Sequence, residues 1–265
     1  MNCNDIDKAL DEGAIAAQPT PGAQEHLNHC ARCRELVAAL SLPVSKASPS
    51  AASLLQIERG LVADLRPVRP LAAKPYFLVA LAAIFLGVVA LGVYRIGAFA
   101  LPVMSALQAS VILGALAISA ALLAYSLVNQ MAPGSLHRIP PIVLPLAITL
   151  SLALAMVVLF QFQHQRNFWA NSWGCIRAGT PLGVLTAVPL WFVLRRGAVL
   201  SPSITGLASG LFAGLVGTTV LEIHCPILDA WHILLSHLGV AVLGAMAGLF
   251  LGLAAEKGQT IWRRA

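Results

Sequence analysis

The sequence predicts an all-α protein in which a small helical domain is followed by a six-helix transmembrane bundle. Of its 265 residues, 58% are hydrophobic and only 11% are charged, whereas soluble domains carry about 25% charged residues. Residues 1–74 hold eight basic and eight acidic side chains, while residues 75–265 hold nine and three. The net charge of +6 therefore lies beside apolar segments, where membrane proteins keep anchoring charges, and a basic nucleic-acid-binding patch is disfavoured.

The strongest local motif in the first 40 residues is His26-Leu-Asn-His29-Cys30-Ala-Arg-Cys33, with Cys3 before it. Two cysteines separated by two residues can bind one tetrahedral Zn²⁺ through thiolates at about 2.3 Å. On a helix His26 projects from the same face as Cys30, and Cys3 completes a Cys₃His shell, with His29 as a rival ligand. Four protein ligands leave no open position for water, so the predicted zinc site is structural and not hydrolytic.

The alternative for such a cysteine pair is a redox dithiol, which usually accompanies a β-α-β pattern that this sequence lacks. The motif resembles the zinc-binding anti-sigma domain of bacterial regulators that sequester extracytoplasmic-function sigma factors. Leu10-Asp11-Glu12-Gly13 and His26-Leu27 are similar to further elements of that family. Gln18-Pro19-Thr20-Pro21 departs from it and is expected to shorten the second helix at its start. The resemblance implies a zinc cofactor and a sigma-factor partner.

Residues 41–74 form a Ser/Pro/Ala-rich linker with one predicted helix, which Ser48 or Ser50 can cap and which ends before Pro67. An apolar stripe at helical spacing runs along it, at Leu54, Ile57, Leu61 and Leu65. This stripe can pack back on its own domain or enter the groove of a partner. In the resembled family the segment after the zinc site wedges into the sigma factor, which favours the partner.

Residues 75–265 contain six mostly apolar segments that meet or approach the 20 or so residues needed to cross roughly 30 Å of hydrocarbon. They are Tyr76–Tyr94, Leu101–Asn129, Ile142–Phe162, Ala178–Leu194, Leu200–Leu221 and Ala230–Ala254. The fourth is the shortest and carries Pro181 and Pro189. Glycines recur every four residues in the last two segments, which predicts a close helix–helix contact. They are Gly206, Gly210, Gly214, Gly244, Gly248 and Gly252.

Basic residues in the connecting loops predict the orientation of the spans, since cytoplasmic loops carry an excess of Lys and Arg. With the N-terminus in the cytoplasm, three basic residues lie outside: Arg95, Arg166 and Arg177. Nine lie inside: Arg66, Arg69, Lys74, Arg138, Arg195, Arg196, Lys257, Arg263 and Arg264. The sequence therefore predicts a multi-pass protein of the bacterial inner membrane with both termini in the cytoplasm.

The two remaining cysteines, Cys175 and Cys225, then fall at the outer ends of spans, in a compartment where disulfides can form. Near Cys225 lie five further ionisable side chains: Glu222, His224, Asp229, His232 and His237. If Pro226 opens the sixth helix, Cys225 shares a face with Asp229 and His232, and His237 lies further down it. Sulfur, imidazole and carboxylate side chains at the outer end of the spans suit a soft divalent metal or an oxidant. Ionisable residues that enter a membrane segment usually have a function. The alternative is an ordinary structural disulfide with solvated loop charges.

The membrane portion resembles the NrsF-type six-span anti-sigma factors, which carry one cysteine after the third span and one before the sixth. Cys175 and Cys225 occupy those places, and Cys225-Pro226 with His232 is similar to that family's second-cysteine segment. The resemblance implies that the protein holds an extracytoplasmic-function sigma factor at the inner membrane and releases it under heavy-metal or oxidative stress. It also implies that Cys175, Cys225 and His232 are sensing residues.

Together these observations predict a small cytoplasmic zinc-stabilised helical domain (residues 1–40), a linker with an amphipathic helix (41–74) and a six-span transmembrane sensor domain (75–265). The predicted function is a membrane-bound anti-sigma factor and not an enzyme. Its expected partners are the sigma factor, membrane lipid and a heavy-metal ion at the periplasmic face, without direct nucleic-acid contact.

The alternative function is a polytopic metal-ion transporter with a cytoplasmic metal-binding domain. Transport requires polar groups near the bilayer midplane, and the six segments show no mid-span carboxylate or histidine. An intramembrane enzyme requires a reactive constellation at depth. His237 is the deepest candidate for one, and in the sequence it stands alone.

Overall fold

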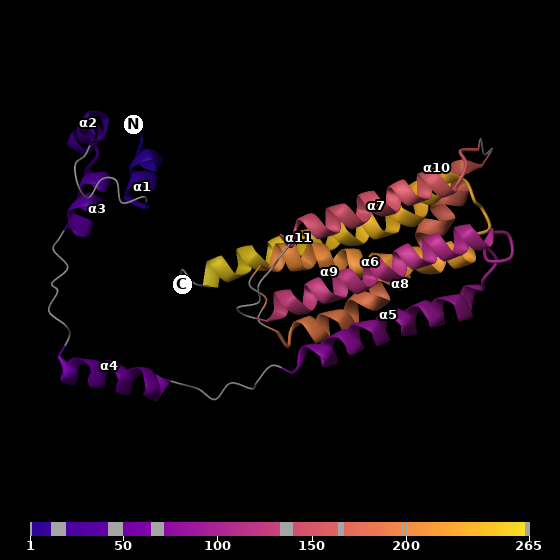
Figure 1. Ribbon diagram of the computed structural model, residues 1–265, viewed down its shortest axis with the longest axis horizontal. Coiled ribbons are helices and arrows are strands. Elements are labelled where there is room, and N and C mark those ends of the chain that lie inside the picture. Colours follow the sequence, from indigo (N-terminus) through magenta and orange to yellow (C-terminus); the bar gives the residue numbers. More distant parts are fainter. Residues whose placement is uncertain are drawn as a thin grey trace. The chain divides into compact units, whose positions relative to one another are not determined.

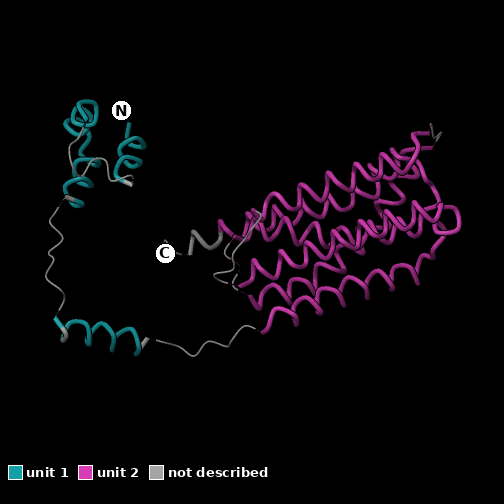
Figure 2. Tube along the Cα trace, viewed as in Figure 1, with its two compact units in different colours: residues 1–68 teal, residues 69–265 magenta. Residues whose placement is uncertain are grey.

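The computed structural model describes residues 2–11, 20–41, 50–64, 72–132, 140–163, 167–197, 199 and 201–262. The chain divides into two compact units, residues 1–68 and residues 69–265 (Figure 2). Apart from one isolated bridge between Gln161 and Asp229, the regular elements of the described residues are helices. The all-α prediction is confirmed for this part of the chain.

The described residues of unit 1 form four short helices, and its small core lies among the first three. The helices are α1 (Cys3–Asp11), α2 (Pro21–His29), α3 (Ala31–Ser41) and α4 (Ala51–Asp64). Helix α2 begins at a proline, which loses no hydrogen bond at the first helical position. The buried core consists of Ile6, Ala23, Leu27 and Cys33. Since so few side chains are buried, this core supplies little folding free energy by itself.

Helix α4 is capped by Ser50, whose hydroxyl accepts a hydrogen bond from the backbone N–H of Ser53 at 3.1 Å. Of the two caps that the sequence allowed, the structure uses this one, and Ser48 lies outside the described residues. Glu12, Gly13 and Leu65, which the sequence analysis also singled out, lie outside them as well.

Unit 2 is a bundle of long helices that run side by side (Figure 1). The first five are α5 (Lys74–Ile96), α6 (Ala106–Met131), α7 (Val143–Leu159), α8 (Phe168–Leu194) and α9 (Pro202–His224). The last is built from α10 (Ala230–His232), the π-helix η1 (Ile233–Leu238) and α11 (Gly239–Trp262). Within the described residues, five helices are long and apolar enough to cross a membrane, and α7 is apolar but has only 17 residues.

The fourth predicted segment is not the shortest, which corrects the sequence analysis. Helix α8 has 27 residues, begins at Phe168, and continues through both Pro181 and Pro189. Apolarity located the end of this helix at Leu194 but not its start, because Asn171 and Arg177 interrupt the apolar run without interrupting the helix. Prolines are tolerated in such helices because neighbouring helices satisfy the freed backbone groups.

Helix α9 is the centre of the bundle, because all twelve residues from 211 to 222 are buried. Its contact with α11 is made backbone to backbone through the two glycine rows. A Cβ at Gly210 lies only 2.1 Å from the carbonyl oxygen of Gly244, and one at Gly248 lies 2.1 Å from that of Gly206. Real Cβ atoms do not approach backbone so closely, so the predicted glycine contact is confirmed.

Gly210→Val is expected to disrupt the packing of α9 against α11. The added side chain meets backbone that cannot move aside, and overpacking of this kind costs about 1–3 kcal/mol or more. Gly114→Val is the matched control, because a Cβ at Gly114 in α6 meets nothing within 4 Å. The thermal unfolding temperature of the full chain in detergent measures both; equal temperatures for the two variants would contradict the contact.

The ends of the unit 2 helices gather at two opposite ends of the bundle (Figure 1). At one end, the N–H of Ala100 donates to the carbonyl of Ile223 at 3.1 Å, and that of Ala230 donates to Gln161 at 3.0 Å. We call this the cysteine end, since Cys225 lies there between α9 and α10.

At the opposite end, the linker end, the ammonium of Lys74 donates to the side chain of Asn129 at 2.9 Å. There the hydroxyl of Ser203 also donates to the carboxylate of Glu256 at 2.7 Å. Helix α5 begins at this end, and α11 ends at the same end (Figure 1).

Candidate functional site

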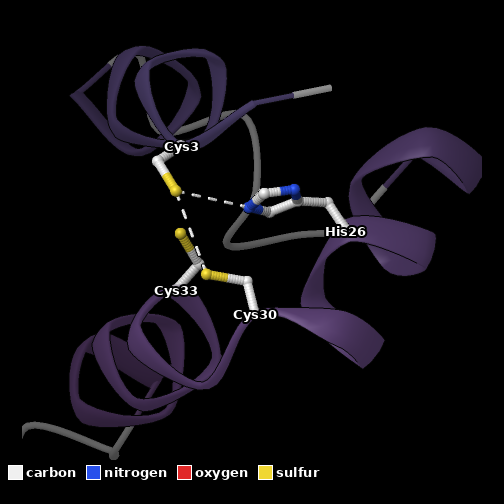
Figure 3. Close-up of side chains that lie close together, drawn as sticks. All are labelled: Cys3, His26, Cys30 and Cys33. Carbon is white, nitrogen blue, oxygen red and sulfur yellow. Dashed lines mark hydrogen bonds between the residues drawn. The ribbon is translucent and has the colours of Figure 1, made fainter.

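Three cysteines and one histidine of unit 1 converge on one point (Figure 3). Cys3 Sγ lies 3.7 Å from His26 Nε2 and 3.9 Å from Cys30 Sγ. With Cys33, the four ligand atoms all lie within 4.8 Å of one another. Two sulfurs bound to one tetrahedral zinc ion at about 2.3 Å lie about 3.8 Å apart. The cluster therefore has the dimensions of a four-ligand metal site.

A break between two helices brings these ligands together, which corrects the expectation that His26 and Cys30 share one helix face. Helix α2 ends at His29, Cys30 is extended, and α3 begins at the next residue. The N–H of Cys30 still donates to the carbonyl of His26 at 2.9 Å. Of the two rival histidines, His26 joins the cluster, whereas His29 is exposed and lies outside it.

The two cysteines of the pair have opposite electrostatic surroundings. The backbone N–H of Cys33 forms a hydrogen bond with the sulfur of Cys30, which lowers the pKa of Cys30 because it stabilises the thiolate. Cys33 itself is fully buried, and burial raises its pKa to about 12. A metal ion that binds here must therefore displace the thiol proton of Cys33, which makes binding dependent on pH.

Cys33 belongs to the hydrophobic core of unit 1 and to the cluster at the same time. The donors are three sulfurs and one imidazole, a set that suits a soft or borderline cation and not Mg²⁺ or Ca²⁺. Because all four positions of a tetrahedron are taken by protein, an ion here cross-links α1, α2 and α3.

The apolar stripe of α4 is exposed. Leu54, Ile57 and Leu61 are 50%, 58% and 66% exposed. Packing back on unit 1, which the sequence left open, does not cover these three side chains.

A second group of cysteines and histidines lies at the cysteine end of unit 2. Cys175 Sγ lies 3.6 Å from Cys225 Sγ, and each sulfur lies 3.4 Å from His232 Nε2. These are the three residues that the sequence analysis selected, and the structure brings them together. Both cysteines are free thiols, because a disulfide requires about 2.05 Å between the sulfurs.

His237 also joins this group, so the interpretation that it stands alone is wrong. A ring nitrogen of His237 lies within 4.8 Å of the ligand atoms of the other three residues. Its Nδ1 lies 3.0 Å from the carboxylate of Glu222, and both side chains are buried, 1% and 0% exposed. On the other side, Ser172 Oγ lies 3.2 Å from Nδ1 of His232.

The π-helix η1 brings His237 next to His232. Residues five apart on an α-helix differ by about 140° around its axis. In a π-helix the backbone bonds join residues five apart, so such residues lie nearly one above the other. His232 precedes η1 and His237 lies within it, and their ring centroids are 5.3 Å apart. The sequence signal was the polar run of His232, Ser236 and His237 within an apolar segment.

Two other residues near Cys225 do not join the group. The carboxylate of Asp229 caps the last helix by accepting from the N–H of His232 at 3.0 Å, and it also accepts from that of Gln163 at 2.7 Å. The sixth helix therefore begins after Asp229, and the expectation that Pro226 opens it is wrong. Nδ1 of His224 lies 3.4 Å from the carbonyl oxygen of Gly97, away from the cluster.

Comparison with known protein families gave one match. The model of the NrsF family, described as negative regulator of sigma F, matches residues 61–255. Comparisons with curated proteins and with solved structures gave no match. The matched range contains Cys175, Cys225, His232 and His237, and it begins after the cluster of unit 1. It confirms the resemblance found in the membrane portion of the sequence.

Proposed function

The chain belongs to the family of negative regulators of sigma F, and from this membership we propose that it is a membrane-bound anti-sigma factor that sequesters an extracytoplasmic-function sigma factor. The family match over the helical bundle is the observation that carries this proposal. It favours regulation over metal transport. We propose a regulator and not an enzyme, because both cysteine–histidine groups offer four protein ligands and so leave no open position for a substrate.

The ion proposed for unit 1 is Zn²⁺, held by Cys3, His26, Cys30 and Cys33. Three thiolates and one imidazole are a common shell for structural zinc. The resemblance of this motif to the zinc-binding anti-sigma domain supports the same ion. In this proposal unit 1 adds a sigma-binding domain to the membrane bundle of the family. In this arrangement the metal supplies the folding free energy that the small core of unit 1 lacks.

The orientation proposed for unit 2 places the linker end in the cytoplasm and the cysteine end in the periplasm. Lys74, Arg195 and Arg196 lie at or next to the ends of helices that face the linker end. Cytoplasmic ends of membrane helices carry this excess of basic residues. A protein of the bacterial inner membrane oriented in this way places unit 1 on the side of the sigma factor. It places the group around Cys225 at the periplasmic end of the bundle, the side from which external metals and oxidants arrive.

Affinity purification of the full chain from detergent-solubilised bacterial membranes tests the function. We expect a sigma factor to co-purify with the chain. When the chain is added in excess, we expect this sigma factor not to bind core RNA polymerase. If the purified chain carries no sigma factor, and added sigma factors bind core polymerase equally well in its presence, the proposed function is wrong.

Leu54→Asp, Ile57→Asp and Leu61→Asp are each expected to weaken sigma-factor binding. Each replaces an exposed apolar side chain of α4 by a charge that the interface has to bury without a partner. Loss of a central interface residue costs about 2 kcal/mol or more, which is roughly thirtyfold in the dissociation constant. Gln56→Asp is the control, because Gln56 is exposed on the same helix but outside the stripe. Equal affinities for stripe and control variants would exclude α4 as the binding segment.

A further inference from the structure

We propose that Cys175, Cys225, His232 and His237 form a second, independent metal site, which binds a thiophilic divalent cation such as Zn²⁺ or Cd²⁺. Glu222 and Ser172 are its positioning residues. The binding itself follows from the geometry of unit 2 alone.

The distances within the group match a tetrahedral ion with two sulfur and two nitrogen ligands. Bond lengths of about 2.3 Å to sulfur and about 2.05 Å to nitrogen give edges of about 3.8 Å between sulfurs and about 3.6 Å from sulfur to nitrogen. The observed edges are 3.6 Å between the two sulfurs and 3.4 Å from each sulfur to His232 Nε2. A small outward movement of the ligands accommodates the ion.

Both histidines are oriented by a second residue, as metal-bound histidines usually are. Nδ1 of His232 faces the hydroxyl of Ser172 at 3.2 Å, and Nδ1 of His237 faces the carboxylate of Glu222 at 3.0 Å. Each ring is left with Nε2 to offer to an ion. Nε2 of His237 is buried and has no hydrogen-bond partner among the described residues, a costly arrangement that a bound cation relieves.

The backbone around His237 is held in the conformation that the site needs. The hydroxyl of Thr218 in α9 donates to the carbonyl oxygen of His237 at 2.7 Å, within the π-helix η1. Single π-turns occur frequently at functional sites. Without this π segment, His237 points about 140° away from His232, so the unusual helix and the four-ligand group depend on each other.

The chemistry of the donors selects the class of cation. Two thiolates and two imidazoles prefer Zn²⁺ and Cd²⁺ and discriminate against Mg²⁺, Ca²⁺ and Mn²⁺, which prefer oxygen ligands. The ligands come from α8, the α9–α10 loop, α10 and η1. A bound ion therefore fixes the spacing of three membrane helices at the cysteine end, and loss or gain of the ion changes their packing.

The test uses the full chain in detergent. The substitutions His26→Ala, Cys30→Ser and Cys33→Ser remove the metal ligands of unit 1, so that the metal bound is that of unit 2. Co²⁺ serves as a spectroscopic probe and Cd²⁺ as the ion for stoichiometry. We expect one Cd²⁺ per chain and a tetrahedral Co²⁺ spectrum with a thiolate charge-transfer band. Cys225→Ser is expected to abolish both, and Glu222→Gln to weaken Cd²⁺ binding by about 10–100-fold.

His224→Ala is the matched control, because His224 adjoins Cys225 in the sequence but lies outside the group. An octahedral Co²⁺ spectrum, no Cd²⁺ bound, or a Cys175–Cys225 disulfide that forms in the presence of metal would overturn the proposal. So would Glu222→Gln binding as tightly as the control. The Co²⁺ spectrum of the chain with intact unit 2 tests the tetrahedral thiolate site even if these variants misfold.

Sigma-factor binding is measured separately, on chains with intact unit 1. A chain that binds sigma factor but no Cd²⁺ in unit 2 contradicts the second metal site alone. A chain that binds Cd²⁺ there but no sigma factor contradicts the proposed function and leaves the site standing.

Discussion

His26→Ala is expected to release zinc from unit 1, unfold α1 to α3 and abolish sigma-factor binding, while His29→Ala leaves all three properties unchanged. Structural zinc in small domains contributes about 10–16 kcal/mol of apparent binding free energy, which is also folding free energy. The core of unit 1 is too small to replace it. Removal of a direct ligand should lower the zinc affinity by more than the roughly 10–100-fold that is lost when a residue hydrogen-bonded to a ligand is substituted.

The two histidines make a closely matched pair, since both lie in the last turn of α2 and only His26 faces the sulfurs. Elemental analysis gives the zinc content, and amide hydrogen exchange of residues 3–11 and 21–41 reports the folding. If His29→Ala loses zinc while His26→Ala keeps it, the ligand assignment in unit 1 is wrong.

Cys225→Ser is expected to lock the sigma factor in its bound state. Serine has nearly the same shape as cysteine but is a poor ligand for thiophilic cations and cannot be oxidised to a disulfide. To change the ratio of bound to free sigma factor from 99:1 to 1:99, a signal must supply about 5.5 kcal/mol of differential affinity. Without the thiolate, neither a metal nor an oxidant can supply it at this site.

A reporter gene driven by the sigma factor measures this response in cells that carry the variant chain. We expect low expression before stress and no rise with cadmium, chromate or peroxide, at unchanged levels of the protein. His224→Ala should respond as the unaltered chain does. Normal induction in the Cys225→Ser cells would show that the signal enters elsewhere.

Much of the fold was predictable because membrane helices and their contacts leave simple patterns. The glycine rows, for example Gly206, Gly210 and Gly214, predicted a close contact, since only a residue without a Cβ allows backbones to touch. The start of α8 was not predictable in this way, because hydropathy locates only the uniformly apolar part of a helix. Residues 168–177 are therefore helical without being uniformly apolar.

The candidate sites show the same division. The spacing of Cys30 and Cys33 predicted the first cluster. Which of the two histidines joins it could not be predicted, because that depends on the break between α2 and α3. In the second cluster, the sequence placed His237 further down the face of Cys225, but its contact with the other ligands depends on η1, which α-helical periodicity does not predict. Glu222 was placed near the cluster by sequence, yet its pairing with His237 depends on how α9 and the last helix pack together.

The distribution of the sigma factor between the membrane and soluble fractions of unstressed cells shows whether this chain tethers it through its metal-bound domain. Cells that make the unaltered chain should hold the sigma factor in the membrane fraction, and cells that make the Cys30→Ser chain should release it to the soluble fraction. An equal distribution in the two, with both chains present in the membrane at the same level, would contradict a metal-organised, membrane-tethered anti-sigma factor.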